Sequence, residues 1–289
     1  MNPAVNTIAN RLSLRPPQRT SLEILARICD IIPMEKDADL PAAPGAAQAG
    51  VAQALSAVQS EFSTVTDFER DFPSLCFALA TGVGKTRLMG AFIAYLNKTE
   101  GIRHFFVLAP NLTIYNKLIA DFTPNTPKYV FQGIAEFAVN PPLVVTGDNY
   151  LDGRGVRREG HFSGVDWEHD VHVNIFNIGK ITSIETPKGG VKTSIPKFRR
   201  LQEYIGQSYF DYLSKLDDLV LLMDESHRYR ASAGMKAINE LKPILGLELT
   251  ATPQIERGGR SEPSARPTNQ MSASRPAASA EAGPSPNRS

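Results

Sequence analysis

The eight residues LATGVGKT, from Leu79 to Thr86, constrain the possible folds of this chain more than any other part of its sequence. They follow a short apolar run, LCFAL, and precede a segment whose apolar residues have helical spacing as far as Leu96. A glycine-rich turn between a strand and a helix is the setting in which a backbone loop binds phosphate groups. The run therefore predicts an α/β fold with a phosphate site at the end of one strand.

Each residue type in this run has a use in binding a triphosphate. Gly82 and Gly84 let the backbone turn its N–H groups toward an anion, and a helix that begins near Lys85 adds the positive end of its dipole. Lys85 offers an ammonium to the β- and γ-phosphates, and Thr86 offers a hydroxyl to Mg²⁺. The general pattern has a glycine where this chain has Leu79, so a chance glycine turn is the alternative. The candidate nucleotide-binding residues of the loop are Thr81, Gly82, Val83, Gly84, Lys85 and Thr86.

A second acidic motif completes the predicted phosphate site. The apolar run Leu219–Met223 is followed directly by Asp224 and Glu225, in the sequence LVLLMDESH. Carboxylates that follow a parallel strand lie at the edge of the sheet where ligands bind. We expect Asp224 to hold Mg²⁺ and Glu225 to orient or deprotonate an attacking water. The alternative is an acidic helix N-terminus, which favours the same residue types.

Short apolar runs alternate with helical segments from Leu75 onward. This alternation is typical of βαβ units in a mostly parallel sheet with helices on both faces. After LCFAL and HFFVLAP, further strands are expected at Leu143–Thr146, Val173–Phe176, Leu219–Met223 and Leu247–Thr250.

The rest of the chain divides into two flanking parts. Residues 1–60 predict an N-terminal helical segment, with a helix in SLEILARICDII, a flexible Ala-, Gly- and Pro-rich loop at 41–50 and a weaker helical pattern at 51–60. Residues 61–254 form the predicted nucleotide-binding domain. Residues 255–289 have few large apolar side chains and predict a disordered tail.

Composition adds few constraints on the partners of this chain. The formal net charge is +1, so any nucleic-acid contact must come from local basic patches. Cys29 and Cys76 lie in apolar surroundings without a CxxC pattern, which argues against a zinc site or a disulfide framework. The sequence has neither a signal-peptide pattern nor an apolar run of membrane-spanning length, so we expect a cytoplasmic protein without membrane contact.

The order of these motifs resembles superfamily-two helicases, and within them the restriction (Res) subunit of type III restriction enzymes. RPPQR is similar to the upstream glutamine motif that contacts adenine, and LATGVGKT and LMDESHRYRA match motifs one and two. VLAPNLTIYNKL and VNIFNIGKI resemble the two DNA-facing motifs, LTATPQ resembles motif three, and VVTGDNY and GQSYFDYL look specific to the type III group. The resemblance covers about residues 10–254 and implies a RecA-like P-loop domain, ATP and Mg²⁺ as cofactors, and a DNA-dependent ATPase activity.

The resemblance also implies roles for single residues. Gln18 would contact adenine, although a glutamine after two prolines is often an exposed loop residue. His227 would link the ATP site to Thr250 and Thr252, whose alternatives are a surface turn and ordinary strand hydroxyls. The DNA-binding candidates, for which turns at strand ends are the alternative, are Asn111 and Asn177. A basic cluster that either neutralises DNA phosphates or is plain solvated surface comprises Lys192, Lys197, Arg199 and Arg200.

The family implies partners that lie outside this sequence. The complete family protein acts on double-stranded DNA together with a methyltransferase (Mod) subunit, and a second RecA-like domain supplies arginines to the ATP site. We expect neither that domain nor the family's nuclease domain in the 35 residues after Gln254, so the chain looks truncated and should hydrolyse ATP slowly by itself. A nucleotide-binding remnant without turnover is the second hypothesis. A phosphoryl-transfer kinase is the third, which DESH followed by TAT disfavours.

Overall fold

The computed structural model describes residues 2–34, 36, 46–152, 156, 171–182, 197–202, 206–225, 232–251 and 270–272. Within them, seven strands form one sheet in the order β3-β4-β2-β7-β8-β1-β9, and every neighbouring pair is parallel. The predicted α/β class with a parallel sheet is confirmed. The strands of this sheet are β1 (Ser74–Ala78), β2 (His104–Ala109), β3 (Leu143–Thr146), β4 (His172–Asn177), β7 (Leu219–Asp224), β8 (Leu245–Thr250) and β9 (Gln270–Ser272).

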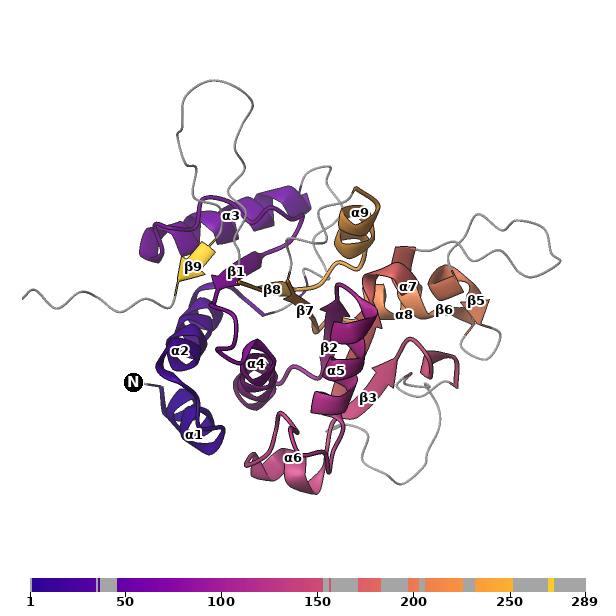
Figure 1. The fold of residues 1–289 in the computed structure, drawn as a ribbon. Coiled ribbons are helices and arrows are strands. Elements are labelled where there is room, and N and C mark those ends of the chain that lie inside the picture. Colours follow the sequence, from indigo (N-terminus) through magenta and orange to yellow (C-terminus); the bar gives the residue numbers. More distant parts are fainter. Residues whose placement is uncertain are drawn as a thin grey trace, which may run out of the picture.

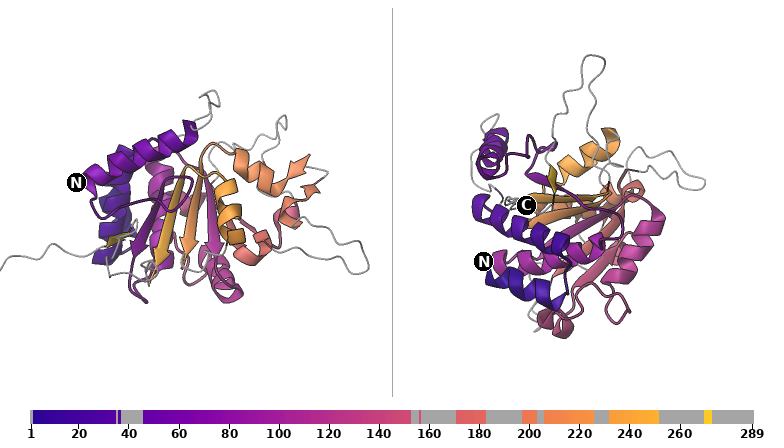
Figure 2. Two further views of the ribbon diagram at one scale, coloured as in Figure 1. Left: turned by 90° about the horizontal axis from the view of Figure 1, so that it is seen from above. Right: turned by 60° about the vertical axis from the view of Figure 1, so that its left-hand side comes forward.

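Helices cover both faces of the sheet (Figures 1 and 2). The first face packs against α1 (Pro3–Arg11), α2 (Pro16–Ile31), α4 (Lys85–Glu100) and α5 (Leu112–Phe122). The second face packs against α7 (Ile178–Thr182), α8 (Tyr209–Lys215) and α9 (Ser232–Glu240). The remaining elements are α3 (Ala46–Glu61), α6 (Ala135–Val139), the short 3₁₀ helices η1 (Tyr150–Asp152) and η3 (Lys197–Arg199), and the antiparallel pair β5 (Leu201–Gln202) and β6 (Gln207–Ser208).

The two faces of β2 show how the strand sequence builds both cores. Phe105 and Val107 lie in the core under α4, whereas Phe106 and Leu108 lie in the core under α8 and α9. All four side chains are fully buried. Because successive side chains of a strand point to opposite faces, an unbroken apolar run is what a sheet covered on both sides requires.

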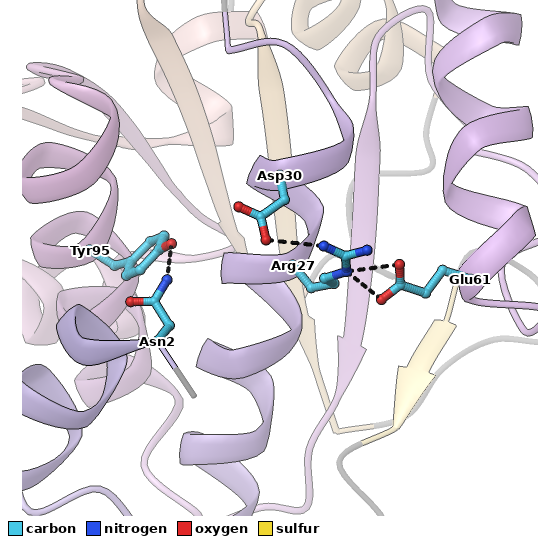
Figure 3. A network of polar contacts seen from close by, with 5 residues as sticks. All are labelled: Asn2, Arg27, Asp30, Glu61 and Tyr95. Carbon is cyan, nitrogen blue, oxygen red and sulfur yellow. Dashed lines mark hydrogen bonds and ion pairs between the residues drawn. The ribbon is translucent and has the colours of Figure 1, made fainter.

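The N-terminal helices are tied to the rest of the molecule by polar contacts at their surfaces (Figure 3). The Asn2 side chain donates to the Tyr95 hydroxyl of α4 at 3.1 Å. Arg27 of α2 pairs with Glu61 at the end of α3, with Nε–Oε1 at 2.7 Å, and also with Asp30. Their apolar faces share one core with α4, so α1 and α2 pack as part of the nucleotide-binding fold.

The structure differs from the sequence expectation at one place near each end of the chain. The helix α3 begins at Ala46, inside the segment 41–50 that we expect to be a loop, because its alanines favour a helix in spite of Gly50. In the tail, expected to be disordered, the structure places Gln270–Ser272 as strand β9 beside β1. Residues 255–269 and 273–289 of this tail lie outside the described residues, and disorder there stays a prediction.

Asp218 directly precedes β7, so it lies at the amino ends of the strands, on the opposite side of the sheet from the phosphate loop. His104 Nδ1 lies 2.5 Å from its Oδ1, and the Arg103 N–H donates to its Oδ2 at 2.8 Å. Burial is the largest single influence on the pKa of Asp218 and raises it. The hydrogen bonds and charges of His104 and Arg103 act in the opposite direction, and together they lower the pKa below its usual value. The folded state therefore favours the ionised carboxyl.

Substituting Asp218 with asparagine is expected to lower the free energy of unfolding by about 1 kcal/mol at pH 7. A carboxyl with a depressed pKa stabilises the fold above its unfolded pKa, about 3.9, and loses this effect as the pH falls through its folded pKa. The difference between the wild type and Asp218→Asn should thus be complete at pH 6 and shrink below about pH 4. Urea unfolding across this range measures it, and a difference that stays constant down to pH 3 would contradict the assignment.

Candidate functional site

The phosphate loop connects β1 to α4 at the carboxyl end of the sheet. Gly82 and Gly84 have φ of +81° and +96°, the left-handed region that favours glycine, and Gly84 precedes the first residue of α4. The N–H groups of the first helical turn therefore face the loop, where an anion would lie. Thr81, Gly82 and Gly84 are exposed, and Val83 is half-buried against the core. Leu79, the departure from the general pattern, is buried, and its N–H donates to Thr250 O at 2.9 Å.

Two residues from the start of α2 hold this loop from outside. The Gln18 side chain is 2% exposed, accepts from the Arg15 N–H at 2.8 Å and donates to Gly84 O at 2.9 Å. The Arg15 guanidinium donates to Gly82 O at 3.0 Å. Both polar atoms of Gln18 are thus engaged within the chain, and its contact with adenine stays a prediction. Sequence reasoning did not single out Arg15, whose only signal is its place three residues before Gln18.

Lys85 and Glu225 form an ion pair across the site. Lys85 Nζ lies 2.7 Å from Glu225 Oε1, and the two side chains are 13% and 20% exposed. Glu225 has φ of +52°, which residues with a side chain seldom adopt outside functional sites and turns. Its N–H donates to Leu249 O at 2.8 Å, and its Oε2 accepts from the Ala251 N–H at 3.4 Å. The Glu225 carboxylate is thus held between Lys85, next to the phosphate loop, and the residue that follows β8.

Asp224 is the last residue of β7 and is 8% exposed. Burial above all, together with the adjacent Glu225 carboxylate, raises the pKa of its carboxyl to about 6, although the cations Lys85 and Lys117 oppose this rise. A carboxylate whose ionisation is disfavoured by burial gains from a nearby cation. Asp224 therefore has the electrostatic environment of a cation ligand.

The residues around Asp224 fit Mg²⁺. Thr86 follows Lys85 in α4 and offers a hydroxyl oxygen, and Asp224 offers a carboxylate next to Glu225. Hard oxygen ligands of this kind suit Mg²⁺, which normally completes its shell with water and phosphate oxygens. Thr86 and Asp224 would hold the ion between the loop and β7.

Lys117 of α5 is a member of the site that sequence reasoning missed. Its Nζ donates to Thr86 Oγ1 at 2.8 Å and to Asp121 Oδ2 at 2.7 Å. The spacing of Lys117 and Asp121 by four residues predicts a pair on one helix face. Nothing in the sequence shows that this face points toward Thr86.

Comparisons with known proteins can be set beside this geometry. The family model described as "Type III restriction enzyme, res subunit" matches residues 43–255, which is most of the chain. The chain belongs to this family. Membership supports a helicase-type ATP-binding domain, and the matched range includes the phosphate loop and the acidic motif. A search of curated proteins found no match.

Two solved structures show some likeness to this Res-family chain. The Sulfolobus solfataricus SWI2/SNF2 ATPase core, solved in complex with double-stranded DNA, is 15% identical with a TM-score of 0.34, and the match covers 62% of this chain and 28% of that one. T4 UvsW is 10% identical with a TM-score of 0.30, and the match covers 73% of this chain and 30% of that one. Neither TM-score reaches 0.5, so neither likeness supports an argument here. The Res-family chain spans less than a third of either matched chain.

The predicted coupling residues lie only partly within the described structure. Thr250 ends β8 beside the phosphate loop, and its side chain is buried. Because Thr250 O accepts from the Leu79 N–H and Glu225 accepts from the Ala251 N–H, this segment contacts both halves of the site. His227 and Thr252 lie outside the described residues, and their roles stay predictions.

Both predicted DNA contacts also have a local structural role. The Asn111 side chain caps α5 by accepting from the Ile114 N–H at 2.9 Å. Asn177 ends β4 and accepts from the Gly179 N–H at 2.8 Å. These are the turn roles that we weighed as the alternative, and a DNA contact through the remaining amide groups stays a prediction.

The predicted basic cluster is only partly described. The Arg199 guanidinium stacks on the Phe210 ring at 3.8 Å and pairs with Glu240, so its charge is used within the molecule. Lys197 begins η3 and Arg200 follows it, whereas Lys192 lies outside the described residues. Among the helices that the structure describes, none is long and apolar enough to cross a membrane.

Proposed function

We propose that this Res-family chain binds ATP with Mg²⁺ and serves as the first RecA-like half of a DNA translocase. The observation that carries the proposal is the meeting of the phosphate loop with the acidic motif, in which Lys85 Nζ lies 2.7 Å from Glu225 Oε1. The two motifs follow β1 and β7, which lie on either side of β8. Residues more than 130 positions apart in the chain thus converge at one edge of the sheet.

The residues divide the chemistry among them. The N-terminus of α4 and Lys85 provide positive charge for the triphosphate, while Thr86 and Asp224 would hold Mg²⁺, which neutralises the phosphate charge when bound. Glu225 is positioned to orient a water and accept its proton once ATP draws Lys85 away. Its contact with the Ala251 N–H connects that event to the segment with Thr250 and Thr252.

DNA contact is proposed at the same edge of the sheet. β2 and β4 are paired with Ala109 opposite Asn177, and Asn111, two residues after Ala109, caps the start of α5. Asn111 and Asn177 therefore follow neighbouring strands. We propose that double-stranded DNA binds here, and that the complete protein works with a Mod methyltransferase subunit in restriction.

Phosphate release from the purified chain tests this proposal. We expect slow release with ATP and Mg²⁺, faster release when duplex DNA is added, and a rate at least about tenfold lower for Glu225→Gln. The variant keeps the size of the side chain and excludes a contaminating ATPase. ATP binding without any release would instead favour a nucleotide-binding remnant, and absence of ATP binding would contradict the proposal.

A further inference from the structure

The Lys117 ammonium of α5 contacts Thr86, one of the two proposed Mg²⁺ ligands. It donates to Thr86 Oγ1 at 2.8 Å and to Asp121 Oδ2 at 2.7 Å. The Lys117 side chain is 54% exposed, whereas that of Asp121 is 9% exposed. The carboxylate is thus a fixed anchor, and the ammonium is a mobile group at the end of a flexible stem.

The contact with Thr86 sets Lys117 apart from an ordinary ion pair on a helix. A hydroxyl oxygen that accepts from an ammonium presents its lone pairs to a positive charge, as it would to Mg²⁺. Two cations at the same small oxygen repel each other, so Lys117 and Mg²⁺ exclude one another there. Lys117 also acts on the second proposed ligand, because it is among the charges that lower the pKa of Asp224.

We propose that Lys117 takes the place of Mg²⁺ at the Thr86 hydroxyl while the site holds no nucleotide, and withdraws to Asp121 when Mg²⁺ and ATP bind. The inference rests on the proposed function, since it concerns the same phosphate site. Withdrawal breaks the contact with Thr86 and keeps the one with Asp121, so the ammonium is never left without a partner. Lys117 is therefore a positioning residue that sets how much Mg²⁺ the site requires.

Substitutions of Lys117 and Asp121 test this role, because they should change the Mg²⁺ requirement in opposite directions. The measurement is the Mg²⁺ concentration that gives half-maximal binding of a fluorescent ATP analogue. Lys117→Met removes the competing cation and should lower this concentration about fivefold, within the usual range of coupling between sites. Asp121→Asn removes the anchor to which Lys117 withdraws and should raise it by a similar factor. The double variant should behave like Lys117→Met, because Asp121 acts through Lys117.

A matched control and a second ligand complete the design. Lys98→Met breaks the exposed ion pair with Glu136, whose Nζ–Oε1 distance is 2.8 Å, and should leave the Mg²⁺ requirement unchanged. Equal shifts in the same direction for Lys117→Met and Asp121→Asn, or no shift in either, would overturn the inference. Weaker analogue binding by Lys117→Met at saturating Mg²⁺ would also overturn it, because Lys117 would then bind phosphate.

Binding of Mn²⁺ alone, followed by its electron paramagnetic resonance signal, separates this inference from the proposed function. Mn²⁺ favours the same oxygen ligands as Mg²⁺. If the wild type fails to bind the ATP analogue but Lys117→Met still binds Mn²⁺ more tightly than the wild type, the proposed function fails and the inference holds. If the analogue binds and the Mn²⁺ affinities are equal, the inference fails and the proposed function holds.

Discussion

Substituting Arg70 with methionine is expected to lower the free energy of unfolding by about 3–5 kcal/mol, because it leaves the Glu248 carboxylate buried without its partner. Arg70 Nε lies 2.9 Å from Glu248 Oε1, and the two side chains are 2% and 5% exposed. The Ser74 hydroxyl donates to the same Glu248 oxygen at 3.1 Å. The Ser74 hydroxyl alone cannot compensate the negative charge of Glu248 in the middle of β8. Urea unfolding monitored by circular dichroism measures the loss.

A second substitution separates the ion pair from the space that it fills. In the double variant Arg70→Met and Glu248→Met, no buried charge remains, so most of the lost stability should return. Arg27→Met, which breaks an exposed ion pair with Glu61, should leave the free energy of unfolding nearly unchanged. A cost below about 1 kcal/mol for Arg70→Met would show that the pair behaves like an exposed one and that Glu248 is solvated in the folded chain.

Six of the seven strands of the sheet could be predicted from the sequence, because each of the six is a short apolar run. The run Leu219–Met223 is apolar throughout, and a strand buried on both faces requires this. The Arg70–Glu248 pair has no such signal, since its two residues lie 178 positions apart and meet only through the pairing of β1 with β8. The strand β9 could not be predicted either, because Met271 is its only large apolar residue and three residues are too few to show a strand pattern.

The site shows the same division between local and long-range information. Lys85, Thr86, Asp224 and Glu225 could be predicted because the chemistry of phosphate binding fixes residue types at short spacing. The partners of these residues come from tertiary packing. The contact of Gln18 with Gly84 and the reach of Lys117 to Thr86 depend on how α2 and α5 pack beside α4.

The second large effect is expected at Lys85. Substituting Lys85 with alanine should weaken the binding of ATP with Mg²⁺ by about 2–3 kcal/mol, or roughly 30- to 150-fold, because a charge-assisted contact to the triphosphate is lost. The loss should be large because Lys85 is mostly buried and faces little competition from solvent. It should appear as a higher dissociation constant in calorimetric titration.

The ion pair of Lys85 with Glu225 makes this prediction sharper, because the two members should act in opposite directions. ATP must draw Lys85 away from the Glu225 carboxylate, and that carboxylate also repels the phosphates. Glu225→Gln removes both obstacles and keeps the side-chain size, so it should tighten ATP binding a few-fold while it slows hydrolysis. Lys98→Met on the exposed side of α4 should leave the affinity at the wild-type value. Equal affinities for the wild type and Lys85→Ala would contradict the assignment of this loop to phosphate binding, whatever the behaviour of Glu225→Gln.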